Sequence, residues 1–296
     1  MMRPNNFLLR RATVAVTVFG AAAALVSCGS TEPRSVLDDI EGGEVILGTK
    51  YDQPGLGLRH PDKSMAGVDV DVATYVVNHI ADANGWAHPQ ITWRETPSVQ
   101  RETLINNGEV TMITATYSIN AGRAKAVDFG GPYLLTNQAL LVRDDDRSLD
   151  SLEDLNAGRK LCSVTGSTSA QKIKDALPGV QLQEFDSYSS CVEALYRGKV
   201  DALTTDATIL AGYAVQYDDE LRVVPMTKPD GEPFTNEHYG IGHAKGDEAS
   251  TEAINGALRE MYESGEFRRI LERNLGDNAD TAGEDAIGDL SFLEES

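Results

Sequence analysis

Basic residues are scarce in this chain of 296 residues, which has 26 lysines and arginines against 46 aspartates and glutamates. The formal net charge is −20 at pH 7. Because nucleic-acid binding needs a basic face, this balance excludes a general nucleic-acid binder. An anionic ligand would have to meet a local group of cations, against the field of the whole protein. The few cations near predicted strand ends are therefore informative.

Motifs of catalysis and metal binding are also missing. The sequence has no G-x-S-x-G, no H-E-x-x-H and no phosphate-binding loop. Its five histidines are scattered, and only three cysteines are present. Two cysteines without a nearby histidine pair do not make a zinc site. We predict that the protein has no metal and no cofactor and is not an enzyme.

A hydrophobic run near the N-terminus is too short to span a membrane. Arg3, Arg10 and Arg11 precede apolar residues 12–26, a pattern typical of a secretory signal over residues 1–27. This segment holds three arginines and no acids, so its removal takes the net charge from −20 to −23. The last residues of the run and Cys28 read L-V-S-C, which resembles a lipobox, in which the cysteine is diacylated. The alternative is an ordinary secretory signal with a chance cysteine.

Lipidation of Cys28 would leave an even pair, Cys162 and Cys191, in an exported protein. This count predicts a disulfide between them. Closing a loop of about 30 residues would stabilise the fold by about 3–4 kcal/mol on the chain-entropy model. We expect the protein at the outer face of the cell membrane, anchored by its N-terminal lipid, because one diacylglycerol carries two chains.

Strand and helix patterns alternate along the chain, which predicts an α/β fold. One repeat matters most: the pattern Leu104, Gly108, Val110 and Ile113 returns as Leu195, Gly198, Val200 and Leu203. Each copy is a helix, a glycine stop and a buried strand, which favours two similar halves. The predicted strands cover residues 44–49, 91–95, 110–114, 139–143, 160–164, 180–185, 200–205 and 238–243. The predicted helices cover residues 69–83, 97–107, 167–177, 189–197, 207–215, 248–264 and 266–275.

The stretch 112–133 combines hydroxyls with an arginine. Thr114, Thr116 and Ser118 occupy alternate positions, so they would share one face of an extended segment. Arg123 follows, and a guanidinium with nearby hydroxyls suits a carboxylate. From spacing alone, a strand end with a surface arginine is an equal alternative.

This stretch resembles the signature of the family 3 extracellular solute-binding proteins, the polar amino-acid receptors of ABC importers. The match consists of the hydroxyl pair, the arginine, and V-x-F-x-x-P-Y at residues 127–133. The family usually has a glutamate or lysine before the arginine, where this chain has Ala121-Gly122. The resemblance covers about residues 40–275, and KYDQPGLGLR, SYSSCVEAL and DALTTDATIL resemble glutamate-binding lipoproteins of actinobacteria.

The resemblance implies a two-lobed, type II periplasmic-binding-protein fold with a ligand cleft between the lobes. Lobe 1 would comprise residues 41–140 and 235–276, and lobe 2 residues 141–234, with crossovers near 138–143 and 224–237. Residues 28–40 would be the lipidated cysteine and a tether. Residues 277–296 hold seven acids and no lysine or arginine, which predicts a mostly disordered acidic tail.

The resemblance also assigns roles to residues. Arg123, Thr116 and Ser118 would bind the α-carboxylate of an amino acid, helped from lobe 2 by Thr168 and its neighbour Ser167. Ser167 is equally a plain helix N-cap. Asp206 would pair with the α-ammonium, although it could also cap the next helix.

Four further positions would contact the ligand's side chain. Arg101 and Lys50 match cationic positions of receptors for acidic ligands, although an arginine one turn into a helix is usually solvated. Tyr51 and Tyr188 would pack against ligand carbons, although tyrosines at such positions are more often core. Some relatives have a histidine where this chain has Tyr188.

Together these features predict a lipid-anchored, monomeric receptor that delivers L-glutamate to the membrane subunits of an ABC importer. Hinged closure of the lobes would trap the ligand. Receptors for glutamine, aspartate or asparagine are the alternatives within the family. A dehydratase-like enzyme on the same fold is an alternative of another class. A sensory domain would need a transmembrane helix and an effector domain, which we do not find in the sequence.

Overall fold

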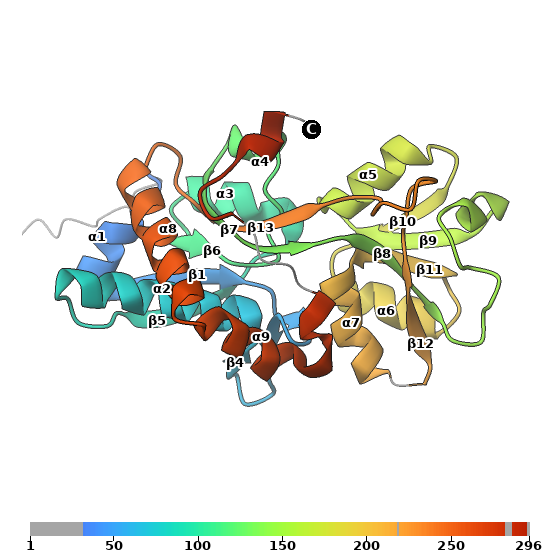
Figure 1. Cartoon of the computed structure of the whole chain (residues 1–296), viewed down its shortest axis with the longest axis horizontal. Helices are drawn as coiled ribbons and strands as arrows, with labels where there is room; N and C mark the ends of the chain where they lie inside the picture. The colour runs from blue at the N-terminus through green and yellow to red at the C-terminus, as the bar shows by residue number, and fades with distance from the viewer. Residues whose placement is uncertain (1–31, 218, 282–285, 295–296) are drawn as a thin grey trace, which may run out of the picture. The chain divides into compact units, whose positions relative to one another are not determined.

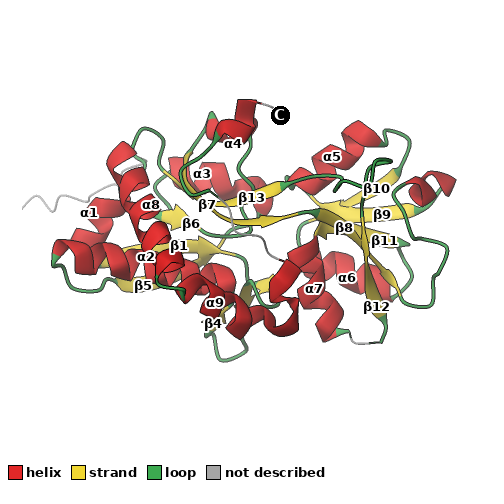
Figure 2. Cartoon of the chain, viewed as in Figure 1, coloured by secondary structure: helices red, strands yellow, loops and turns green. Residues whose placement is uncertain are grey.

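The computed structural model describes residues 32–217, 219–281 and 286–294. The predicted signal over residues 1–27 and Cys28 lie outside the described residues. In the described part of the chain, no helix is both long enough and apolar enough to cross a membrane. The described strands form two five-stranded sheets and one small three-stranded sheet, with helices packed around them (Figures 1 and 2).

The first sheet mixes parallel and antiparallel strands. Strand β1 runs parallel to its two neighbours, whereas β13 runs antiparallel to both of its own. The strand order is β5 (Gln90–Glu95), β1 (Glu44–Thr49), β6 (Met112–Ile113), β13 (Glu237–His243) and β7 (Asp128–Thr136). The helices of this half are α1 (Val36–Glu41), α2 (Val68–Asn84), α3 (Arg101–Asn106), α4 (Ala121–Ala124), α8 (Glu248–Glu263) and α9 (Glu266–Leu275). We call this sheet and the elements packed on it lobe 1.

The second sheet has the same number of strands and carries three helices. The strand order is β10 (Gln181–Phe185), β9 (Lys160–Val164), β11 (Ala202–Asp206), β8 (Gln138–Arg143) and β12 (Leu221–Pro225). Its helices are α5 (Thr168–Ala176), α6 (Tyr188–Tyr196) and α7 (Ala207–Gln216). We call this half lobe 2. Strand β11 is buried along its whole length, and β8 is buried except at Arg143, which explains why both strands are mostly apolar or hydroxyl-bearing.

The chain passes between the sheets at two places. Strand β7 of the first sheet continues through Asn137 alone into β8 of the second sheet. Strand β12 returns through residues 226–236 to β13. The first passage, at Asn137, therefore comes just before the predicted crossover at residues 138–143. The chain enters the second sheet at Gln138, slightly before residue 140, where lobe 1 was predicted to end. Both connections lie beside strand ends, where ligands bind in open α/β sheets.

Two terminal segments are more ordered than the sequence predicted. Residues 36–40, assigned to the tether, belong to α1, and Val36 and Ile40 are fully buried in the core. In the acidic tail, Leu290, Phe292 and Leu293 pack against a buried cluster that contains Tyr117. Both predictions relied on the polar composition of these segments. They gave too little weight to the few apolar side chains, which are spaced for a short helix in the first segment and packed on the core in the second.

A small sheet beside α2 was not predicted. It consists of β2 (Asp52–Gln53), β3 (Gly57–Arg59) and β4 (Met65–Ala66). Its strands are two or three residues long, which is too short for a period-2 pattern to be recognised. The short 3₁₀ helices are η1 (Ser98–Gln100), η2 (Glu153–Ala157), η3 (Gly276–Thr281) and η4 (Ser291–Glu294).

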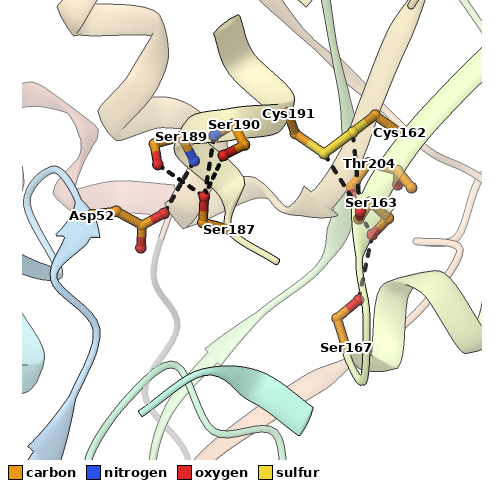
Figure 3. The surroundings of a disulfide bond; sticks show 9 residues. All are labelled: Asp52, Cys162, Ser163, Ser167, Ser187, Ser189, Ser190, Cys191 and Thr204. Carbon is orange, nitrogen blue, oxygen red and sulfur yellow. Dashed lines mark hydrogen bonds between the residues drawn. A yellow bond between two sulfur atoms is a disulfide. The ribbon is translucent and has the colours of Figure 1, made fainter. Parts of the chain in front are cut away.

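The predicted disulfide between Cys162 and Cys191 is present, with a Cα–Cα distance of 5.9 Å (Figure 3). It joins β9 to α6, and both cysteines are fully buried. The bond therefore fixes the first turns of α6 to the second sheet, close to the pocket described next.

Candidate ligand-binding site

A small pocket lies between strand ends and helix starts of the two lobes, and its atom-free space is about 220 Å³ when the open solvent at its mouth is included. Lobe 1 contributes Ser98, Arg101, Thr116, Ser118 and Arg123, and lobe 2 contributes Ser167, Thr168, Tyr188, Asp206 and Ile209. Eight of the ten predicted site residues thus line one pocket: Lys50 and Tyr51 do not, and the others are Arg101, Thr116, Ser118, Arg123, Ser167, Thr168, Tyr188 and Asp206. Such a small and mostly polar pocket suits a compact zwitterion better than an apolar ligand.

The hydroxyl stretch does not continue as a regular strand. Strand β6 ends at Ile113, and Thr116 has a positive φ of 46°, which is uncommon for a β-branched residue. The Asp69 carboxylate at the start of α2 explains this conformation, since it accepts from the Thr116 amide at 2.8 Å. The turn still brings Thr116 and Ser118 into the pocket lining, whereas Thr114 is buried without lining it.

Arg123 is 9% exposed and spans the two lobes. Its Nη1 donates to the Ser118 carbonyl at 2.6 Å, and its Nη2 donates to the Gly166 carbonyl of lobe 2 at 3.0 Å. Its Nε lies 3.4 Å from a Glu102 carboxylate oxygen. Asn120 caps the short helix α4 that carries Arg123. The surface arginine that spacing alone allowed is therefore not what the structure shows.

Arg101 is 2% exposed, in contrast to the usual solvated helix arginine. Its Nη1 donates to the Ala115 carbonyl at 3.0 Å, and its guanidinium carbon lies 4.2 Å from the centre of the Tyr117 ring. Burial and the neighbouring Arg123 lower the pKa of Arg101 to about 10. Among the described residues it forms no ion pair with a carboxylate at 4.0 Å or less, so the site holds a desolvated cation with N–H donors to spare.

Lys50 lies directly behind the pocket lining. It is 5% exposed, and its Nζ donates to the Ser98 hydroxyl at 2.9 Å. Burial, followed by repulsion from Arg101, lowers the pKa of Lys50 to about 7. Lys50 thus adds to the cationic character of lobe 1, although it does not itself line the pocket.

The start of α5 contributes in the two ways that the sequence left open. Ser167 is the N-cap, because its hydroxyl accepts from the Ala170 amide at 3.1 Å, and it also lines the pocket. Thr168 opens the helix, and its hydroxyl lies 3.4 Å from that of Ser118 in lobe 1. A helix start with free N–H groups attracts an anion.

Asp206 is 3% exposed and ends β11. It occupies the N-cap position of α7, but its side chain makes no capping hydrogen bond. Its carboxylate instead accepts from the hydroxyls of Tyr239 at 2.6 Å and Ser169 at 3.4 Å. Burial, followed by repulsion from Glu237, raises the pKa of Asp206. Of the two roles open in the sequence, the structure is compatible with an acceptor for a ligand cation.

The two tyrosines differ. Tyr188 is 4% exposed, and burial raises its pKa to about 12, so it stays neutral in the lining. Tyr51 is placed elsewhere: its hydroxyl donates to the Trp93 carbonyl at 2.9 Å, and it does not line the pocket. Lys50 and Tyr51 follow the end of β1 and have different partners: the Lys50 ammonium donates to Ser98 beside the pocket, whereas the Tyr51 hydroxyl donates to the Trp93 carbonyl.

Sequence reasoning missed two lining residues, Ser98 and Ile209. Both lie in the first turn of a helix that follows a strand, which was the available signal. Within the described ranges, no group of three histidine, cysteine or acidic side chains could hold a metal ion.

Comparisons with known proteins agree with this geometry. The profile of the bacterial extracellular solute-binding proteins, family 3, matches residues 45–277. The glutamate-binding protein GluB of Corynebacterium efficiens is 64% identical over 295 residues, covering 99% of this chain and 100% of that protein. The ABC transporter glutamine-binding protein GlnH of Bacillus subtilis is 33% identical over 264 residues, covering 88% and 92% of the two chains.

A solved structure shows the same fold. An ancestral arginine-binding protein bound to glutamine has a TM-score of 0.69 and 31% identity, over 79% of this chain and 98% of that one. The predicted two-lobed, periplasmic-binding-protein-like α/β fold is thereby confirmed. With a family profile that spans most of its length and a pocket between two α/β lobes, the chain belongs to family 3 of the bacterial extracellular solute-binding proteins.

Proposed function

We propose that this protein is a receptor for L-glutamate that delivers it to an ABC importer. The observation that carries the proposal is the charge of the pocket lining, which contains two guanidinium groups, Arg101 and Arg123, and one carboxylate, Asp206. This set is the inverse of glutamate, which has two carboxylates and one ammonium. All three side chains are at least nine-tenths buried, so the pairing would form in a water-poor site where it discriminates strongly.

The roles follow from position. Arg123, with the hydroxyls of Thr116 and Ser118 and the start of α5, would bind the α-carboxylate. Asp206 would accept from the α-ammonium. Arg101, with Lys50 behind it, would bind the side-chain carboxylate. Tyr188 and Ile209 would cover the ligand's carbons.

Glutamine is the main alternative ligand, because the Bacillus subtilis relative is a glutamine-binding protein. The similarity to the glutamate-binding relative is much higher, at 64% against 33% identity. The buried cations also favour a dicarboxylate, since glutamine's neutral amide would leave Arg101 without a counter-charge.

Calorimetric titration of the lipid-free protein with each of the twenty amino acids tests the proposal. We expect glutamate to bind tightest. Tightest binding of arginine or histidine would contradict an acidic ligand, and the absence of binding by any amino acid would contradict the receptor itself. Recovery of unchanged glutamate after incubation would separate a receptor from a dehydratase-like enzyme.

The pH dependence of glutamate binding should differ from that of glutamine binding. Lys50 has a pKa of about 7 in this structure, and a bound side-chain carboxylate would raise it. Glutamate binding would then take up a proton, so affinity is full below pH 7 and falls as pH rises above it, by at most about tenfold per unit. Glutamine lacks the carboxylate, so it should lose less over the same range.

The measurement is the Kd for both ligands between about pH 6 and 9. Because the two ligands share the titrating α-ammonium, glutamine is the internal control. The variant Lys50→Met should remove the extra loss for glutamate. Parallel pH profiles in the unsubstituted protein would rule out a role for Lys50 in binding the side-chain carboxylate.

We also propose that Cys28 carries the lipid anchor, because L-V-S-C resembles a lipobox. The variant Cys28→Ser lacks the thiol that forms the thioether, so the protein should leave the membrane fraction. Continued partition of Cys28→Ser with membranes in detergent extraction would exclude this anchor. A monomer with two lobes that close around the ligand completes the proposal.

A further inference from the structure

The lobes also meet outside the pocket. The segment 52–54 of lobe 1 contacts helices α6 and α7 of lobe 2. None of the five residues that we describe in this contact lines the ligand pocket in the described structure: Asp52, Pro54, Ser189, Gly212 and Tyr213. This second contact, which we call the latch, therefore cannot act by touching the ligand.

One part of the latch is polar. Ser187 is the N-cap of α6 and accepts from the Ser190 amide at 3.2 Å. The next free donor, the Ser189 amide, is taken by the Asp52 carboxylate of lobe 1 at 3.0 Å (Figure 3). A negative charge is favourable at a helix N-terminus, where N–H groups lack partners within the helix. The disulfide at Cys191 holds this end of α6 against β9, so the acceptor meets a fixed donor.

The other part of the latch is close packing on α7. The Tyr213 hydroxyl donates to the Asp52 backbone carbonyl at 2.5 Å, and Tyr213 is 2% exposed. The neighbouring Gly212 packs on Pro54: a Cβ at Gly212 would lie 2.2 Å from the Pro54 carbonyl oxygen and 3.1 Å from its carbon. The obstructing atoms are backbone, so only glycine lets the lobes approach this closely here.

Gly212 is not required by the helix itself. It lies inside α7 (Ala207–Gln216), where glycine is less favourable than alanine. The observed contact with lobe 1 is what accounts for a residue without a side chain at this point.

We propose that the segment 52–54, together with the start of α6 and Gly212, is a latch that stabilises the closed form, and that Asp52 and Gly212 are positioning residues for binding. This inference rests on the proposed function, because it needs a ligand held between lobes that open and close. Contacts made only in the closed form add to the free energy of closure. They strengthen binding of every ligand by the same factor, and so leave selectivity unchanged.

The test compares Gly212→Ala with Gly256→Ala. Both replace a glycine inside a helix, but a Cβ at Gly256 of α8 meets nothing within 4 Å. In Gly212→Ala we expect the affinity for glutamate and for glutamine to fall equally, by about tenfold to a hundredfold, as overpacking at a close contact implies. The loss should appear mainly as faster dissociation in stopped-flow measurements. Gly256→Ala should bind as the unsubstituted protein does.

Thermal unfolding without ligand separates a latch from a permanent contact. If the lobes open, Gly212→Ala should be as stable as Gly256→Ala or more stable than the unsubstituted protein. A marked drop in the Tm of Gly212→Ala alone would show that the contact belongs to the static fold, and would overturn the latch. Unchanged dissociation rates and Kd values in Gly212→Ala would overturn it as well.

A substitution of Asp52 provides a second, independent test of the latch. Asp52→Ala should weaken both ligands by about threefold to tenfold, the size expected for one charged helix-terminal contact, and the loss should shrink at high salt. A change in the ratio of glutamate to glutamine affinity would contradict a latch remote from the ligand. If the unsubstituted protein binds no amino acid, the proposed function fails, and the unfolding comparison still decides whether the Gly212 contact is permanent.

Discussion

In Arg123→Ala, we expect glutamate and glutamine to lose affinity by similar, very large factors. Arg123 is 9% exposed and lies between the hydroxyls of lobe 1 and the start of α5, where the α-carboxylate common to all amino acids would bind. Truncating one partner of a buried, hydrogen-bonded charge pair costs about 2–5 kcal/mol, which corresponds to about thirtyfold to several-thousandfold in Kd. Calorimetric titration of the two ligands measures both losses.

Arg123→Lys and unfolding without ligand are the controls. Lysine keeps the charge but loses the planar guanidinium that binds a carboxylate through two hydrogen bonds. The affinity of Arg123→Lys for both ligands should therefore lie between that of Arg123→Ala and that of the unsubstituted protein. Arg123 also donates to the Ser118 and Gly166 carbonyls, so a stability measurement is needed to separate binding from folding. If Arg123→Ala affected glutamate alone, Arg123 would belong to the side-chain end of the pocket instead.

Most of the site could be predicted because its residues stand at element boundaries that the sequence marks. Thr168 opens a helix after a strand, Asp206 ends a buried strand, and Arg101 follows a proline-marked helix start. Polar residues at such boundaries converge between sheets. The alternation of apolar residues also located most central strands and most of the helices, because burial on both faces leaves long apolar runs.

The rest depended on tertiary contacts that local sequence does not encode. Thr116 adopts a positive φ because the distant Asp69 accepts from its amide. Asp206 lines the pocket and does not cap α7, and its carboxylate accepts from the hydroxyl of Tyr239, which comes from the other sheet. Residues 277–296 hold seven acids and no lysine or arginine, which predicted a mostly disordered tail, yet Phe292 stacks on His238 with ring centres 3.8 Å apart. In each case one long-range partner outweighs composition or propensity.

In Arg101→Met, glutamate should lose far more affinity than glutamine. The expected loss for glutamate is again about 2–5 kcal/mol, because a buried carboxylate would lose its charged partner. Glutamine should change little, because its neutral amide never formed the ion pair. Methionine is chosen because it keeps an unbranched apolar chain against the Tyr117 ring, which lies 4.2 Å from the guanidinium carbon.

The matched control is Arg94→Met, the same replacement at an arginine whose side chain is 43% exposed and paired with Glu109 away from the pocket. Exposed pairs contribute little, so Arg94→Met should bind both ligands as the unsubstituted protein does. Arg101 also donates to the Ala115 carbonyl, so some loss of stability is expected, and it would lower the affinity for both ligands alike. The ratio of glutamate to glutamine affinity is therefore the decisive quantity. If Arg101→Met left that ratio unchanged, the side-chain carboxylate would not bind at Arg101. The selectivity of the amino-acid receptor for glutamate would then need another source, and Lys50 is the next buried cation beside the pocket.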